Sequence, residues 1–135
     1  MIGFIINNWL SILLSSSAGI IVSALWYSDY LFGKEWRNLA KLKNTEDLKS
    51  PVNLLIMLLV IFITALVLKR FIIISNPLDY ISAIKLAIWL WLGFVATYAV
   101  GEFISEKRPM KLLAIDVSNS LVVLVIMSVI LYRIN

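Results

Sequence analysis

Four long apolar segments, separated by short polar stretches, dominate the sequence. Their expected ranges are residues 2–26, 52–74, 80–102 and 110–132. Each is about 20 residues or longer, the length that an α-helix needs to cross the hydrocarbon core of a bilayer. The pattern therefore predicts an all-α integral membrane protein, a bundle of four transmembrane helices that forms a single domain over residues 1–135.

The second segment carries two adjacent cations near its end. A helix over Val52–Leu68 would be about 26 Å long, slightly short for a span, so we expect it to continue past Lys69 and Arg70 into residues 71–74. Long basic side chains can bury their stems and extend their charges to the interface, and both cations are expected to do so. Lys85, near the start of the third segment, is expected to behave in the same way.

The longest polar stretch, residues 27–51, joins the first two segments. Within Gly33–Ser50 the apolar residues Trp36, Leu39 and Ala40 fit helical spacing. Basic residues occupy the other positions: Lys34, Arg37, Lys41 and Lys43. This arrangement is typical of a short amphipathic helix that lies on a membrane surface. A solvated loop is the alternative.

Composition narrows the function mainly by exclusion. The chain is 61% hydrophobic and 15% charged, whereas soluble domains are about 45–50% apolar and about 25% charged. It contains no His and no Cys, which excludes disulfides, His-based acid–base catalysis and metal sites built on imidazole or thiolate. No other catalytic constellation stands out, so we expect no enzyme, no cofactor and no metal site.

Lys and Arg are distributed unevenly between the two sides of the expected bundle. The loops after the first and third segments lie on one side and carry eight: Lys34, Arg37, Lys41, Lys43, Lys49, Lys107, Arg108 and Lys111. The opposite side carries three, at Lys69, Arg70 and Arg133. Cytoplasmic loops carry the excess of positive charge in membrane proteins. We therefore expect a plasma-membrane protein with residues 27–51 in the cytoplasm and both termini outside it. The same clustering disfavours nucleic-acid binding.

Small residues recur every four positions in two of the expected helices. They are Ser11, Ser15, Gly19 and Ser23 in the first, and Gly93, Thr97 and Gly101 in the third. Such stripes let helix backbones approach closely, which is how helices gain packing energy in lipid. We expect both stripes to pack within the bundle, and a seam between copies of the chain or a substrate path are the alternatives.

Polar groups at membrane depth are the candidate functional residues, because an ionisable side chain there costs about 2.5–3.5 kcal/mol on insertion scales. Asp116 lies about 9 Å into the fourth helix, and Asn119 and Ser120 share its face. Chain direction brings this region to the same side as the ends of the first and third helices. We expect a polar vestibule there, formed by Asp29, Lys34, Tyr98, Glu102, Arg108, Asp116 and Asn119. An ion-paired cap that ties the loops to the bundle is the alternative.

Two blocks of the sequence resemble a known family. WYSDYLFGKEW, at Trp26–Trp36, is similar to an aromatic-Tyr-Ser-Pro, Leu-Phe-Gly-Lys, Trp signature, and GFVATYAVGEFISEKRPMKLLAID, at Gly93–Asp116, is similar to a Gly-Phe stretch with an Arg-Pro turn and last helix. The family consists of small four-helix membrane proteins of bacteria and archaea, catalogued as a domain of unknown function (DUF1761-like). The resemblance implies the fold and the membrane location. Asp29 replaces the family's usual Pro, and Asp116 its frequent Asn.

Two functions remain as hypotheses. The first is a homo-oligomeric transporter or channel-like protein for a proton or a cationic solute, which rests on Asp116, Glu102, Asn119 and the serine stripe of the first helix. The second is a non-catalytic accessory or lipid-interacting protein, which rests on the basic stretch Gly33–Ser50. Membrane lipids are the expected partners in both, with copies of the chain in the first. The aromatic residues Trp26, Tyr27, Tyr30 and Trp36 are expected to form an interfacial belt.

Overall fold

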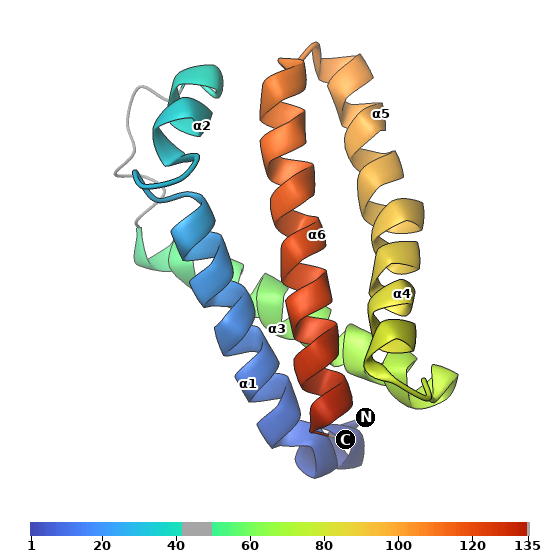
Figure 1. The fold of residues 1–135 in the computed structure, drawn as a ribbon. Coiled ribbons are helices and arrows are strands. Elements are labelled where there is room, and N and C mark those ends of the chain that lie inside the picture. Colours follow the sequence, from blue (N-terminus) through green and yellow to red (C-terminus); the bar gives the residue numbers. More distant parts are fainter. Residues whose placement is uncertain (42–49, 135) are drawn as a thin grey trace.

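The computed structural model describes residues 1–41 and 50–134, and all the regular structure in this part of the chain is helical (Figure 1). The elements are α1 (Ile2–Trp26), α2 (Gly33–Leu39), α3 (Pro51–Ser75), α4 (Tyr80–Leu90), the π-helix η2 (Trp91–Ala96), α5 (Thr97–Glu106) and α6 (Met110–Arg133). The elements α4, η2 and α5 follow one another without a break as a single long helix, which extends four residues beyond the expected end at Glu102.

Within the described residues, four helices are long and apolar enough to cross a membrane: Ile2–Trp26, Pro51–Ser75, Tyr80–Glu106 and Met110–Arg133. They suggest a multi-pass membrane protein and confirm the expected all-helical fold with four long helices. A short helix in the first loop is also present, as α2. Part of the stretch Gly33–Ser50 that was expected to be amphipathic, including Lys43 and Lys49, lies outside the described residues.

Local sequence signals explain where the long helices begin and end. The Ser50 hydroxyl accepts a hydrogen bond from the Asn53 N–H at 3.3 Å and caps α3, which starts at a proline. Asp79 caps α4 in the same way, at 2.7 Å from the Ser82 N–H, and these bonds hold the pKa of its carboxyl below the usual value. Lys107 ends α5 in the left-handed conformation, so that the chain turns at once into α6.

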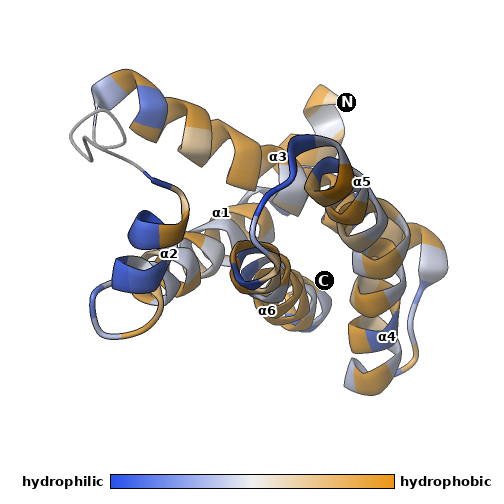
Figure 2. Ribbon diagram, turned by 90° about the horizontal axis from the view of Figure 1, so that it is seen from above, coloured by the Kyte–Doolittle hydropathy of each residue, from blue (hydrophilic) through white to orange (hydrophobic). Residues whose placement is uncertain are grey.

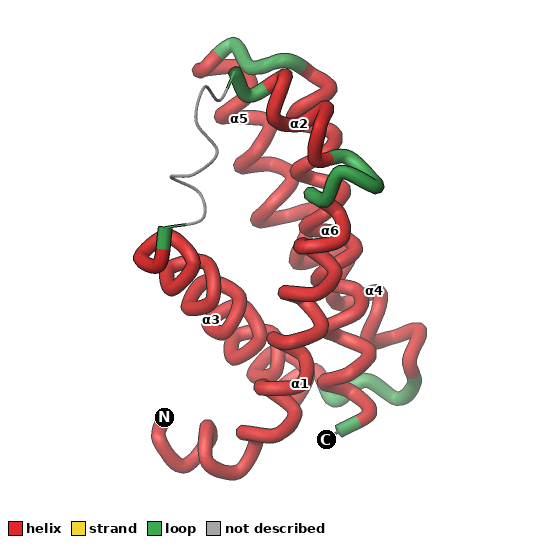
Figure 3. Tube along the Cα trace, turned by 90° about the vertical axis from the view of Figure 1, so that its left-hand side faces the viewer, coloured by secondary structure: helices red, strands yellow, loops and turns green. Residues whose placement is uncertain are grey.

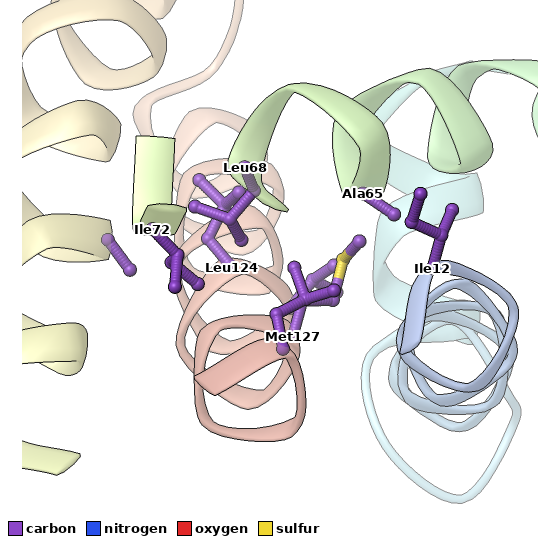
Figure 4. Close-up of a cluster of buried hydrophobic side chains, with 9 residues drawn as sticks. Ile12, Ala65, Leu68, Ile72, Leu124 and Met127 are labelled. Carbon is purple, nitrogen blue, oxygen red and sulfur yellow. The ribbon is translucent and has the colours of Figure 1, made fainter. Parts of the chain in front are cut away.

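Helix α6 is the central element of the bundle. It contacts α1, α2, α3 and each part of the long helix α4–η2–α5 (Figures 1 and 2). Helix α3, in contrast, contacts mainly α1 and α6. The buried apolar cluster forms where α1, α3 and α6 meet, and Ile12, Ala65 and Met127 are fully buried within it (Figure 4). Apolar packing therefore joins the four spans through α6.

Helix α3 packs through only one half of its length. Its buried residues Ala65, Leu68, Lys69 and Ile72 all lie in the second half, whereas the apolar side chains from Val52 to Val60 are exposed. Figure 3 shows that the Pro51 end diverges from the rest of the bundle. An exposed surface of this apolar character suits contact with lipid tails.

The two stripes of small residues have different surroundings. In α1, Ser11, Ser15 and Gly19 are buried, and a Cβ on Gly19 would lie 3.1 Å from the Met127 sulfur, so α1 and α6 approach closely there. The residues Gly93, Thr97 and Gly101 are exposed, and a Cβ on either glycine would meet nothing within 4 Å. Packing of this second stripe within the chain is therefore wrong, because α4 uses the buried Ala83 and Ala87 instead. Its alternative roles, a seam or a substrate path, stay predictions.

The expectation that Lys69 extends its charge to the interface is wrong. Its side chain is fully buried, and Nζ donates hydrogen bonds to the carbonyl oxygens of Leu131 at 3.1 Å and Ile134 at 3.0 Å. These carbonyls belong to the end of α6, where the last turn lacks helical partners and carries partial negative charge. Arg70 and Lys85 are exposed, and the Arg70 guanidinium lies over the Phe4 ring.

Candidate functional site

The carboxyl group of Asp116 accepts two side-chain hydrogen bonds from the aromatic block that follows α1. The Tyr27 hydroxyl donates to Oδ1 at 2.7 Å, and the Trp36 indole N–H donates to the same oxygen at 2.8 Å. Tyr27 comes from the turn after α1 and Trp36 comes from α2. A single oxygen of α6 therefore holds both the turn and the short helix.

A tight turn brings these two donors to Asp116. The Phe32 N–H donates to the Trp26 carbonyl at 3.0 Å, and the Gly33 N–H donates to the Ser28 carbonyl at 2.9 Å. Gly33 is buried, and a Cβ at this position would lie 2.1 Å from the Tyr27 carbonyl oxygen. Only glycine therefore fits where α2 begins, and the close approach directs α2 back over α6.

Two more tryptophans donate to the same region of α6. The Trp26 indole donates to the Ile115 carbonyl at 3.1 Å, and the Trp91 indole donates to the Val117 carbonyl at 3.0 Å. Trp91 also contacts the Ser120 hydroxyl at 3.1 Å. Indole N–H groups supplied by α1, α2 and η2 thus surround the polar turn of α6. This partnering lowers the cost of keeping polar groups in an apolar bundle.

Asn119 is less well satisfied than its neighbours. Its amide nitrogen lies 3.4 Å from the Ser23 hydroxyl, which is a long hydrogen bond. Its Oδ1 atom is buried and has no hydrogen-bond partner among the described residues. Asn119 therefore faces α1, on the side of α6 that also carries Asp116.

Tyr27 is fixed as a hydrogen-bond donor. Burial raises the pKa of its hydroxyl strongly, and the neighbouring Asp116 carboxylate raises it further through the hydrogen bond and its charge. The phenol consequently stays protonated throughout the physiological pH range, since deprotonation would place a second anion beside Asp116.

On its other side, Asp116 lines a small cavity between α5 and α6. The cavity has a volume of about 60 Å³. Its lining combines two acids, one base and four apolar residues: Glu102, Asp116, Arg108, Ala99, Phe103, Leu112 and Leu113. At roughly 30 Å³ of liquid volume per molecule, this space suits about two waters or one ion of similar size.

The profile of the family described as "Protein of unknown function (DUF1761)" matches residues 10–132, which include both blocks quoted above. The chain belongs to this family. Comparison with curated proteins and with solved structures gives no match. Membership in DUF1761 confirms the resemblance seen in the two sequence blocks. The description of the family assigns no activity, so a function for this chain rests on the geometry of the site.

The expected vestibule of the DUF1761 chain is only partly assembled. Glu102, Arg108 and Asp116 line one cavity. Asp29 is exposed and forms an ion pair with Arg37, and Lys34 is exposed on α2. Tyr98 is 68% exposed, and Asn119 faces Ser23. Asp29 and Lys34 do not line the cavity, so grouping them with it is wrong. Tyr98 and Asn119 lie beside it: Tyr98 hydrogen-bonds with Glu102, and Asn119 interacts with Tyr27, which bonds Asp116.

Ion pairs also tie the loops of the DUF1761 chain together at this end. Glu35 of α2 pairs with Lys111 of α6, and Glu106 pairs with Arg108 in the turn before α6. Their side chains are 43–63% exposed, and pairs at that exposure contribute about 0–1 kcal/mol each. The site consequently combines features of the expected vestibule and of its alternative, the ion-paired cap, since it has both a polar cavity and ion pairs at the surface.

The inward role of the tryptophans is the largest feature that the sequence did not reveal. Trp26, Tyr27 and Trp36 were expected to face lipid head groups, but each donates a hydrogen bond to α6. Tyr30, in contrast, is 95% exposed. A usable signal was present, since a carboxylate within an apolar helix needs donors and the nearest aromatic block supplies N–H and O–H groups.

The described residues contain no group of three or more His, Cys, Asp or Glu side chains placed to hold a metal ion. At Asp116, a carboxylate held by two donors lies beside a second acid, Glu102, and beside the Arg108 guanidinium, which is paired with Glu106. Such a set can exchange a proton or hold a small cation.

Proposed function

We propose that this DUF1761 protein is a small transporter or channel-like protein of the plasma membrane that binds a proton or a small cationic solute at Asp116. In this proposal both termini lie outside the cytoplasm, and the cavity opens toward the cytoplasmic side. The observation that carries the proposal is the Asp116 carboxyl group, which lies within a helix long and apolar enough to cross a membrane and lines a cavity together with Glu102 and Arg108.

The two aromatic donors support this function by fixing one oxygen of the carboxyl group. Because Oδ1 already accepts two hydrogen bonds, a ligand in the cavity would contact Oδ2. Arg108 also lines the cavity while its guanidinium pairs with Glu106, and the cavity volume favours a water-sized ligand over a bulky organic cation.

An accessory or lipid-interacting role is the second candidate, and the apolar centre of the bundle favours it. Ile12, Ala65 and Met127 fill the space between α1, α3 and α6 and are fully buried. Transport through one chain would require this packing to rearrange, or a path between copies of the chain that uses the exposed face bearing Gly93 and Gly101.

Flux measurements test the transport proposal. The purified protein in proteoliposomes with an imposed pH or cation gradient should collapse the gradient, and Asp116→Asn should lower this flux at least tenfold. Asparagine keeps an oxygen acceptor for Tyr27 and Trp36 but carries no charge, so the fold should persist. The matched control is Asp79→Asn, an acid-to-amide change at the α4 cap. Absence of flux in the wild-type protein, or equal flux in Asp116→Asn, contradicts the proposal.

Lipid retention tests the second candidate. Lys34 and Lys41 are exposed at the α2 side of the bundle, and a basic residue near an anionic surface contributes about 1 kcal/mol to binding. Replacing both with Gln should reduce, by about tenfold or more, the anionic lipid that stays bound in native mass spectra of protein released from nanodiscs. Lys85→Gln, at the opposite end, is the control. Equal loss in the control would show that the α2 side has no preference for anionic lipid.

A further inference from the structure

We propose that residues 27–39, the turn after α1 together with α2, form a lid over the Asp116 site that is released when the Asp116 carboxylate is neutralised by a proton or a bound cation. The inference rests on the proposed function in one respect, namely that Asp116 is the group that binds the ligand. It adds the means by which occupancy of the site would change the conformation of the chain.

The lid is attached mainly by polar contacts. In α2 only Gly33 is buried, and its neighbours Leu31 and Tyr30 in the turn are 55% and 95% exposed. The contacts to α6 that hold it are the hydrogen bonds of Tyr27 and Trp36 to Asp116 and the exposed ion pair of Glu35 with Lys111. The Phe32 ring also packs against Trp26 at the end of α1, with ring centroids 4.8 Å apart, and Trp36 packs against Tyr27 within the lid. The position of the lid over α6 depends on the polar contacts to Asp116 and Lys111.

Two of these contacts share one atom, and this sharing makes the lid sensitive to the state of Asp116. Both hydrogen bonds end on Oδ1, so any change in the charge of that carboxyl group alters both together. Hydrogen bonds to an ionised acceptor are roughly twice as strong as bonds between neutral groups. Neutralising Asp116 therefore weakens the attachment of the turn and of α2 in one step.

Few other charges face Asp116. Helix α1 contains no charged residue, the turn supplies Tyr27, and α2 supplies Glu35, which is paired with Lys111 of α6. Across the cavity lie Glu102 of α5 and Arg108 of the turn before α6, and Arg108 is paired with Glu106. Tyr27 stays protonated, so the carboxyl groups in this set are those of Asp116, Glu102, Glu106 and Glu35.

Hydrogen exchange of the α2 amides reports the position of the lid. A seven-residue helix is too short to persist in water by itself, so α2 should unfold when it leaves α6. Backbone amides such as Trp36 N–H, which donates to the Phe32 carbonyl, would then exchange rapidly. Exchange is measured by mass spectrometry on the full chain in nanodiscs, corrected for the intrinsic effect of pH on amide exchange.

We expect exchange in α2 to be about 10- to 30-fold faster in Asp116→Asn than in the wild-type protein, because two charge-assisted bonds become neutral. Trp36→Phe, which loses one donor, should give a similar local increase. Lowering the pH should accelerate exchange in the wild-type protein but not in Asp116→Asn. Glu35→Gln, which breaks only an exposed pair, should change exchange less than about threefold.

Unchanged α2 exchange in both Asp116→Asn and Trp36→Phe overturns the lid. An increase spread evenly over all four spans overturns it as well, since Asp116 would then support the whole bundle. A pH response that persists in Asp116→Asn and disappears in Glu35→Gln assigns the response to Glu35 and contradicts the proposal. These readouts do not use flux: local release without flux would retain the lid and reject transport, and flux without local release would do the reverse.

Discussion

Replacing Gly33 with Ala should destabilise the protein by about 1–3 kcal/mol, the usual cost of overpacking a close contact. The new Cβ would lie 2.1 Å from the Tyr27 carbonyl oxygen and 2.7 Å from the Ser28 carbonyl oxygen. Both atoms belong to the backbone, so no side-chain rotation can relieve the clash. The turn itself must move, and the movement carries Tyr27 and Trp36 away from Asp116.

Thermal unfolding of the purified protein in detergent measures this loss. The control is Gly101→Ala, because a Cβ there meets nothing within 4 Å, and Ala is favoured over Gly in a helix by up to about 1 kcal/mol. The two substitutions add the same methyl group but should shift the midpoint in opposite directions. Equal midpoints for the two variants would show that the turn tolerates a side chain at residue 33.

Replacing Lys69 with Met should destabilise the protein by about 2 kcal/mol. The variant loses the hydrogen bonds to the Leu131 and Ile134 carbonyls, and bonds to a charged group contribute about 1.5–3 kcal/mol each. Relief from burying the ammonium group offsets part of this loss. Met keeps an unbranched apolar side chain that is one atom shorter than Lys, so that the comparison mainly removes the charge and its donors and retains most of the apolar packing.

The same unfolding measurement checks this prediction, with Lys85→Met as the matched control. Lys85 is exposed on α4, and its removal should change the unfolding free energy by less than about 0.5 kcal/mol. Hydrogen exchange should also increase at the end of α6 in Lys69→Met alone. If Lys69→Met is as stable as Lys85→Met, the buried ammonium group of Lys69 makes no net contribution to the free energy of unfolding.

Lys69 and the third span show where sequence reasoning reached its limit. The position of Lys69 within an apolar run was evident, but its direction was not, because a long side chain can extend either to the interface or to a neighbouring helix. In the same way, the spacing of Gly93, Thr97 and Gly101 marks one face of a helix without identifying its neighbour. The structure turns that face outward and packs α4 through Ala83 and Ala87.

Asp116 illustrates the corresponding limit for the candidate site. Its depth in α6, and its nearness to Glu102 and Arg108, followed from chain direction and helix geometry, and the three residues do line one cavity. Its hydrogen-bond partners did not follow, because Tyr27 and Trp36 lie 89 and 80 residues away in sequence. Asp29 and Lys34 lie in the same aromatic block, yet they point away from the cavity.

The four apolar helices, their approximate ends and the family could all be predicted from the amino-acid sequence, because hydrophobic length, proline and capping residues act locally along the chain. The buried face of each helix, and the pairing of each donor with its acceptor, became evident only from the packing of the helices. Those choices depend on helix rotation and on the turn at Gly33, where a difference of one residue shifts a side chain by about 100° around the helix.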